Sequence, residues 1–183
     1  MFCWLAFAAI AMIGSRDAVR SDAKRDMKSH AGFFLQGVGY AVCYIFARPY
    51  FSQFIPMPKV AEEILAAFAV AIATVSVWFC YSAARTLGKQ WALVARVIEG
   101  HELVTQGPYS IVRNPIYLAM LGMLIASGLT AARWQIFPVA VALLLLGTDI
   151  RICSEEKLLR ETFGAKFDEY ARRVPAVYPR IVS

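Results

Sequence analysis

Five uncharged apolar blocks, separated by polar connections, dominate the pattern of the chain. They cover residues 1–15, 31–47, 64–84, 116–132 and 134–148. Their lengths are 15, 17, 21, 17 and 15 residues, whereas a helix that crosses a bilayer needs about 20, with roughly 17–25 common. The pattern predicts an all-α fold, a polytopic transmembrane helical bundle with about five spans.

The region after the fifth block keeps a helical spacing of apolar residues from 149 to 174, with Gly164 as the expected interruption. The residues that recur at intervals of three or four are Leu158, Leu159, Phe163, Phe167, Tyr170 and Val174. We therefore predict a C-terminal amphipathic helix and a single domain over 1–183. Residues 1–84 hold three spans, and 85–183 hold two spans and this helix.

The basic residues are distributed unevenly among the connections. Of the 19 Lys and Arg residues, sixteen lie in connections that five spans would place on one side, and three lie on the other. By the positive-inside rule the N-terminus is outside, and the 85–114 connection and the C-terminal tail are cytoplasmic. The net charge of +6 then reflects topology and contact with anionic membrane lipids, so nucleic acid is not an expected partner.

Composition supports the membrane assignment and gives no sign of a metal site. Hydrophobic residues make up 59% of the chain and charged residues 17%, against about 45–50% and 25% in soluble domains. The four cysteines are scattered, with no C-x-x-C and no histidine at ligand spacing, so we expect small packing residues rather than metal ligands. Gly37 and Gly39 are expected to permit close helix packing.

The segment 101–117 is polar and rich in turn-forming residues, although it lies between two apolar runs. Irregular backbone near a membrane persists only where protein or a water-filled cavity satisfies its polar groups. Asn114 precedes Pro115 and is the expected N-cap of the next helix. Taken singly, its tyrosines could be interfacial residues and Arg113 an extended anchor. Together, these residues predict that the segment 101–117 lines a binding site.

Among the charged residues that follow the fifth apolar block are Arg151, Glu155 and Glu156. Arg151 and Glu155 are four apart and share one helix face. An exposed pair of this kind contributes only about 0.3–0.5 kcal/mol. Charges that follow an apolar span are costly unless a ligand or a partner compensates them, so we predict a second part of the site here.

In their order and spacing these features resemble the isoprenylcysteine carboxyl methyltransferase family and its relatives, which include phospholipid N-methyltransferases. The resemblance covers residues 85 to 179. Its motifs are Leu87-Gly88-x-x-Trp91, His101-x-Leu103-Val104-Thr105-x-Gly107-x-Tyr109, Arg113-x-Pro115-x-Tyr117, Arg151-x-x-x-Glu155-Glu156, Phe163-Gly164, Tyr170 and Arg173-Val174-Pro175. The family commonly has histidine where this chain has Asn114, which can donate hydrogen bonds but does not titrate near neutral pH.

The resemblance implies that residues 85–183 bind S-adenosylmethionine on the cytoplasmic side. The implied cofactor contacts are His101, Glu102, Leu103, Val104, Tyr109, Asn114, Pro115, Ile116, Tyr117 and Glu155. Arg151 matches the position that faces the methyl acceptor, and with Glu156 it forms the expected catalytic pair. We expect Glu155 to hold the amine or ribose of the cofactor and Arg151 to orient the acidic or polar head of a lipophilic or lipidated acceptor.

Three alternatives remain open on the sequence. The acceptor could be a phospholipid amine. An NADPH-dependent membrane reductase of the sterol type carries a similar C-terminal tail, but those chains are much longer than 183 residues. A non-enzymatic membrane scaffold or transporter subunit is the third possibility, and the absence of charges from the middle of the apolar blocks disfavours ion or proton transport.

Overall fold

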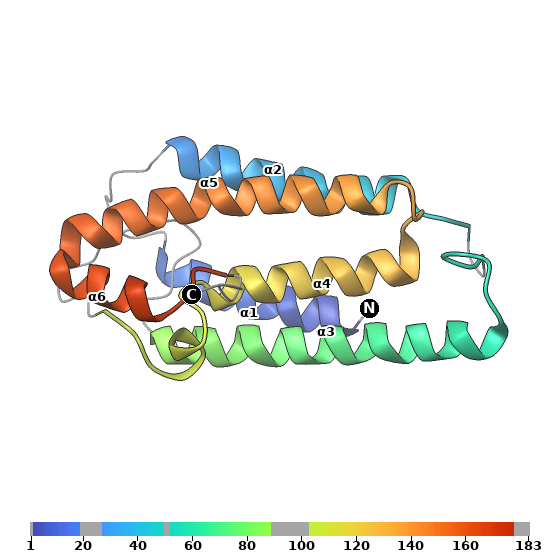
Figure 1. The fold of residues 1–183 in the computed structure, drawn as a ribbon, viewed down its shortest axis with the longest axis horizontal. Helices are drawn as coiled ribbons and strands as arrows, with labels where there is room; N and C mark the ends of the chain where they lie inside the picture. The colour runs from blue at the N-terminus through green and yellow to red at the C-terminus, as the bar shows by residue number, and fades with distance from the viewer. Residues whose placement is uncertain (1, 19–26, 50–51, 89–102, 178–183) are drawn as a thin grey trace.

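The computed structural model describes residues 2–18, 27–49, 52–88 and 103–177 (Figure 1). Within these ranges the regular elements are helices, so the predicted all-α class is confirmed. They are α1 (Phe2–Ala18), α2 (Met27–Ile45), α3 (Lys59–Leu87), the 3-10 helix η2 (Gly107–Ser110), α4 (Pro115–Ala131), α5 (Phe137–Phe163) and α6 (Ala165–Arg173). An isolated β-bridge joins Ala47 and Ala132.

The long helices run lengthwise in an elongated bundle (Figure 1). Helix α2 packs along α5, and α3 packs along α4, while α1 lies against α3. The 3-10 helix η2 and helix α6 lie at one end of the bundle, and the short α4–α5 connection lies at the other. The part of the chain that carries the predicted site is thus gathered at a single end.

Local sequence signals explain where several helices begin and end. Helix α3 follows Pro58 and stops at Gly88, whose φ is 53°. Helix α5 has Pro138 in its first turn, where a proline is tolerated because that amide has no partner within the helix. It ends at Gly164, whose φ of 51° favours glycine. The interruption predicted at Gly164 is therefore confirmed.

Two helices, α3 and α5, are long and apolar enough to cross a membrane, and α4 is a shorter apolar helix. The 29 residues of α3 extend about 43 Å at 1.5 Å per residue. Only 17% of the apolar window of α3 is buried, whereas the core helix of a soluble protein would be mostly covered. Its exposed side chains include Val60, Ile64, Phe68, Val70, Val75, Trp78 and Tyr81.

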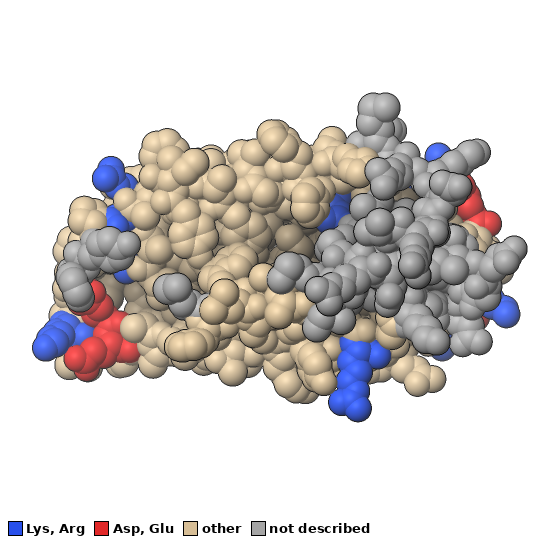
Figure 2. Space-filling model, turned by 180° about the vertical axis from the view of Figure 1, so that it is seen from behind, with Lys and Arg blue, Asp and Glu red and all other residues tan. Residues whose placement is uncertain are grey.

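The surface has the distribution of charge expected for contact with lipid. On the face in Figure 2 a broad uncharged area adjoins the charged side chains at one end of the molecule, and further basic side chains appear near the middle and at the other end. A broad uncharged area of this kind is uncommon on the surface of soluble monomers. We conclude that this is a membrane protein; the number of spans and their orientation stay predictions.

Polar contacts hold α1, α2 and α4 together inside the bundle, and one glycine brings α2 close to α5. Ser127 of α4 accepts hydrogen bonds from Trp4 Nε1 at 3.0 Å and from the Tyr44 hydroxyl at 2.9 Å. A Cβ added at Gly39 would lie 2.9 Å from the Ala140 carbonyl oxygen, so the predicted close packing is confirmed there. It is wrong for Gly37, where an added Cβ would meet nothing within 4 Å.

Candidate functional site

The segment 103–114 connects the end of α3 with the start of α4 and folds around η2. Gly107 has a φ of 59°, and a Cβ there would lie 3.0 Å from Thr86 Oγ1 of α3. Glycine is therefore needed at this position for its backbone conformation and for the close approach. The turn places Tyr109 in the interior, where its side chain is buried.

The C-terminal tail pairs with the end of this segment. The backbone amides of Arg113 and Asn114 donate to the carbonyl oxygens of Pro175 at 2.8 Å and Ala176 at 2.9 Å. Asn114 occupies the N-cap position of α4, but its side chain makes no capping hydrogen bond. The predicted N-cap position is therefore confirmed, but the side chain does not cap the helix: its Nδ2 donates instead to the Ala176 carbonyl at 3.1 Å. The reason is the approach of the C-terminal tail, whose backbone pairs with the segment at this position.

Arg113 joins the segment to α5 and α6. Its Nε and Nη2 lie 2.9 and 2.7 Å from Glu156 Oε1. Its Nη1 donates to the carbonyls of Ala171, at 2.9 Å, and Val174. Both charged side chains of the pair are mostly buried. Arg113 therefore binds three elements of the site together, and the alternative of an extended membrane anchor is wrong.

Tyr170 of α6 holds the other side of the same segment. Its hydroxyl donates to the Tyr109 carbonyl oxygen at 2.6 Å. Burial raises the pKa of Tyr170 to about 12 and also raises the pKa of Tyr109 above its ordinary value. Both phenols are therefore neutral at physiological pH and available as hydrogen-bond donors.

The raised pKa of Tyr170 predicts a measurable dependence of stability on pH. The unfolded chain loses this proton near pH 10, while the folded protein keeps it to about pH 12. The free energy of unfolding should therefore fall as the pH rises from about 10 to 12. Thermal unfolding in detergent at pH 9 to 12 should show a smaller fall for Tyr170→Phe than for the wild type. Parallel curves for the two proteins would contradict this expectation.

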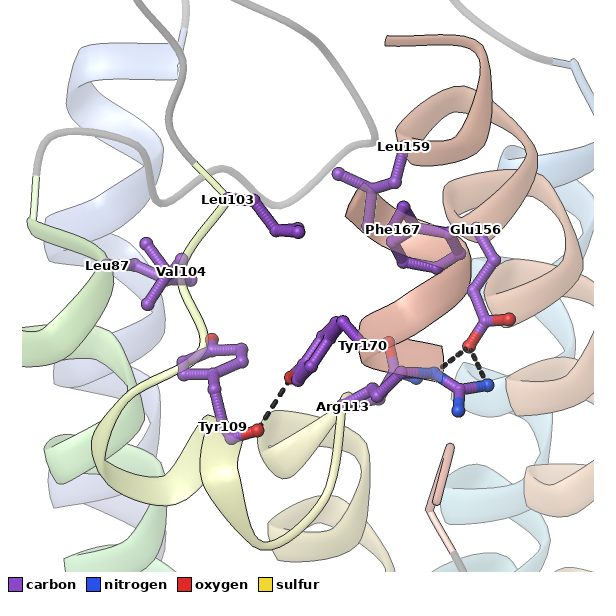
Figure 3. Close-up of a pocket in the computed structure, with 10 residues that line it drawn as sticks. Leu87, Leu103, Val104, Tyr109, Arg113, Glu156, Leu159, Phe167 and Tyr170 are labelled. Atoms are coloured by element: carbon purple, nitrogen blue, oxygen red, sulfur yellow. Dashed lines mark hydrogen bonds and ion pairs between the residues drawn. The ribbon is translucent and has the colours of Figure 1, made fainter. Parts of the chain in front are cut away.

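A pocket opens between the segment 103–114 and the helices α5 and α6 (Figure 3). Its cavity volume is about 70 Å³, below the roughly 300–1,000 Å³ that is usual for ligand pockets. Its lining residues are Leu87, Leu103, Val104, Tyr109, Arg113, Asn114, Glu156, Leu159, Phe167 and Tyr170. In Figure 3 Leu103 and Val104 face Leu159 and Phe167 across the hollow. The lining is thus apolar and aromatic, with one ion pair at its edge.

A second polar group lies beside this pocket in the bundle. The Tyr117 hydroxyl donates to Glu155 Oε1, and Arg151 Nη2 lies 3.4 Å from the same oxygen. The Arg151 guanidinium carbon is 5.1 Å from the centre of the Tyr117 ring. Side-chain exposures of 6% for Arg151 and 22% for Glu155 rule out the exposed ion pair considered above.

The structure distributes the predicted site residues over these two places. The pocket takes Leu103, Val104, Tyr109, Asn114 and Glu156, and the buried group takes Tyr117, Arg151 and Glu155. The consecutive carboxylates therefore point to different partners, and Glu156 rather than Glu155 lines the pocket.

The other residues predicted to contact the cofactor either pack within the bundle or lie outside the described residues. Pro115 is buried at the start of α4. Ile116 packs against an apolar cluster of the bundle. His101 and Glu102 lie outside the described residues.

Several lining residues were not among those predicted to bind the cofactor: Leu87, Arg113, Leu159, Phe167 and Tyr170. Most belong to the sequence motifs or to the helical apolar pattern, so a signal was present. Gln36 of α2 was missed as well. Its side chain accepts from Arg151 Nη1 at 3.2 Å. A strongly polar side chain within an apolar block is itself a signal of function.

Comparisons with known proteins extend these observations. A sequence model described as phospholipid methyltransferase matches residues 64–166. Nickel-cobalt-cadmium resistance protein NccN of Alcaligenes xylosoxydans xylosoxydans is 38% identical over 98 residues, which are 52% of this chain and 45% of that protein. Cobalt-zinc-cadmium resistance protein CzcN of Cupriavidus metallidurans is 37% identical over 98 residues, 52% of this chain and 44% of that protein.

A third relative carries an enzyme name. Protein-S-isoprenylcysteine O-methyltransferase B of Arabidopsis thaliana is 35% identical over 82 residues, 44% of this chain and 41% of that protein. The matched part of this chain thus spans less than half the length of each of these three relatives. Among the residues that the structure describes, no three His, Cys, Asp or Glu side chains gather as they would around a metal ion.

Proposed function

Because this chain belongs to the phospholipid methyltransferase family, we propose that it transfers a methyl group from S-adenosylmethionine to a lipophilic acceptor at the membrane. The observation that carries the proposal is the position of the pocket beside the buried Arg151–Glu155 pair. Glu156 lines the pocket and the adjacent Glu155 pairs with Arg151. A methyl donor in the pocket and an acceptor at Arg151 would therefore lie close together.

The pocket has the chemistry that this cofactor needs. Apolar and aromatic side chains line it on both sides, which suits a purine ring, and the Glu156 carboxylate lies at its edge. When bound, S-adenosylmethionine supplies a methyl group on a positively charged sulfur. We assign the backbone of Leu103 and Val104 to the adenine, and Glu155 to the amine or ribose. Tyr109 and Tyr117 would close the cavity.

The contribution of the chain to the reaction is alignment and exclusion of water. Holding two reactants in line can lower a barrier by roughly 7–11 kcal/mol. We assign Arg151 to the acceptor, because a guanidinium can hold a carboxylate through two parallel hydrogen bonds. The uncharged lateral surface of the bundle (Figure 2) would let an acceptor with an apolar chain approach from the bilayer.

Two acceptor classes have support, and they can be separated. The relative named as an isoprenylcysteine O-methyltransferase and the buried Arg151 favour a prenylated thiol-acid with a free carboxylate. The family name favours a phospholipid amine. Purified protein in detergent, given methyl-labelled S-adenosylmethionine, should label N-acetyl-S-farnesylcysteine. Labelling of phosphatidylethanolamine instead would support the second class, and labelling of neither would contradict methyl transfer to these two classes.

The role of Glu155 makes a direct prediction about binding of the donor. Glu155→Ala should weaken binding of S-adenosylmethionine about 10-fold or more, because a hydrogen bond to a charged group contributes about 1.5–3 kcal/mol. Isothermal titration calorimetry on the purified protein measures this.

Glu161→Ala is the matched control, since Glu161 lies on the same helix and its side chain is exposed. Its affinity should equal that of the wild type. Wild-type affinity in Glu155→Ala, together with a loss in Glu156→Ala, would transfer the role to the carboxylate that lines the pocket.

A further inference from the structure

Helix α2 contributes a buried amide to the side of Arg151. Gln36 is buried, its Nε2 donates to Thr148 Oγ1 at 2.9 Å, and its Oε1 accepts from Arg151 Nη1 at 3.2 Å. A primary amide inside an apolar bundle is costly unless both of its ends are hydrogen-bonded. Here both ends are bonded to α5, so the amide fixes one edge of the guanidinium.

Two glycines bring α2 and α5 into backbone contact at this level. A Cβ on Gly147 would lie 2.6 Å from the Gly32 carbonyl oxygen and 2.9 Å from Gln36 Cγ. A Cβ on Gly32 would lie 2.6 Å from Arg151 Cγ. The helices can approach this closely only because both positions lack side chains. The contact leaves Gln36 little freedom to move away from Arg151.

The guanidinium of Arg151 lies close to two aromatic rings of different exposure. Its central carbon is 5.1 Å from the centre of the buried Tyr117 ring and 5.6 Å from the centre of the Phe33 ring. Phe33 belongs to α2, and 56% of its surface is exposed. Arg151 itself is buried, and one of the two rings against its guanidinium belongs to a side chain at the surface of the bundle.

We propose that α2 forms the acceptor half of the site: Gln36 positions Arg151 for a carboxylate, and Phe33 is the cover that the apolar chain of the acceptor displaces. The inference rests on the proposed function and names its acceptor as a carboxylate on an apolar chain. The family match begins at residue 64, so it assigns no role to this helix.

The positioning role is tested with a pair of probes. One is N-acetyl-S-farnesylcysteine; the other is the primary alcohol that replaces its carboxylate, used as a competitive inhibitor. Gln36→Leu should raise the KM for the acid about 10-fold, while the inhibition constant of the alcohol and the Kd of S-adenosylmethionine stay within 2-fold. General damage to the bundle would move all three values, so the split is specific to the guanidinium.

Thr148 provides a second test if Gln36→Leu does not fold. Thr148→Val removes the hydroxyl that accepts from the amide and should raise the KM for the acid about 3-fold. Thr148→Ser keeps a hydroxyl and should restore the wild-type value. Equal values for both variants and the wild type would overturn the role of the amide.

The covering role is tested with neighbouring phenylalanines. Trp is a larger ring and a stronger partner for a cation, so Phe33→Trp should be harder to displace and should raise the KM for the farnesyl acid about 5-fold. Phe34 is the next residue of α2 and 70% of its surface is exposed, so Phe34→Trp should stay within 2-fold. Equal changes of this KM in Phe33→Trp and Phe34→Trp would overturn the covering role of Phe33.

Failure of the inference and failure of the proposed function give different results. A wild-type protein that neither binds S-adenosylmethionine nor methylates the acid contradicts the proposed function, and the inference is overturned with it. A wild-type protein that does both, with an unchanged KM in Gln36→Leu, overturns the inference alone. Transfer to phosphatidylethanolamine in place of the acid would also overturn it, since Arg151 would then face an amine.

Discussion

Replacing Arg151 with alanine should lower the rate of methyl transfer about 100-fold or more, since removal of one hydrogen-bond donor from the reacting group typically costs about 10²–10³ in rate. The Kd of S-adenosylmethionine should change much less, because we assign Arg151 to the acceptor. Single-turnover measurement with methyl-labelled donor, combined with calorimetry, separates the two quantities. A loss of donor affinity as large as the loss of rate would place Arg151 in the donor site instead.

Arg151→Lys separates the geometry of the guanidinium from its charge. Lysine keeps the positive charge beside Glu155, which limits the destabilisation expected when a buried ion pair loses one partner. It lacks the planar fork that holds a carboxylate by two bonds. We therefore expect Arg151→Lys to fold like the wild type and to remain well below it in rate. A lysine variant with wild-type rate would show that charge alone suffices.

The fold was largely predictable because its signals are local. Apolar blocks without charges, together with Gly164 and the prolines near helix starts, locate the helices to within a few residues. The fifth block is the exception in length, since α5 continues to Phe163. That continuation was expected from the helical spacing after residue 148, which does not depend on the remainder of the chain.

The sequence predicts which residues belong to the site. It does not predict which of them line the pocket and which form the buried group with Arg151. Glu155 and Glu156 are adjacent, so their motif cannot say which of them faces the pocket. That choice depends on how α5 is rotated against α2 and α4, which long-range packing decides. The contact of Gly147 with Gly32 fixes part of that rotation, and no periodicity within either helix predicts it.

The partners of Asn114 and Gln36 illustrate the same limit. Asn114 sits where a capping residue belongs, yet a tail 62 residues away takes its side chain. Gln36 is separated from Arg151 by 115 residues, outside the part of the chain that the resemblance covers. Sequence reasoning found the residues that chemistry needs on α5, and only the fold shows what holds them in position.

Replacing Arg113 with methionine should lower the free energy of unfolding by about 3–5 kcal/mol, the usual cost of removing one partner from a buried ion pair. The substitution leaves the Glu156 carboxylate without its guanidinium and deprives the carbonyls of Ala171 and Val174 of a donor. Chemical unfolding in mixed micelles measures the change. We also expect faster proteolytic cleavage after residue 164 and weaker donor binding, because the same contacts close the pocket.

A double variant tests this explanation against general damage. Arg113→Met with Glu156→Leu no longer contains an unpaired carboxylate, so it should recover part of the lost stability. Arg173→Met is the exposed control, since the Arg173–Glu169 pair has side-chain exposures of 71% and 60% and exposed pairs contribute little. If Arg113→Met were as stable as Arg173→Met, the attachment of the tail would have to come from the backbone pairing at residues 113–114 and 175–176. Since that pairing alone contains two amide hydrogen bonds, each with a net contribution of about 0.5–1.5 kcal/mol, we expect the ion pair to dominate.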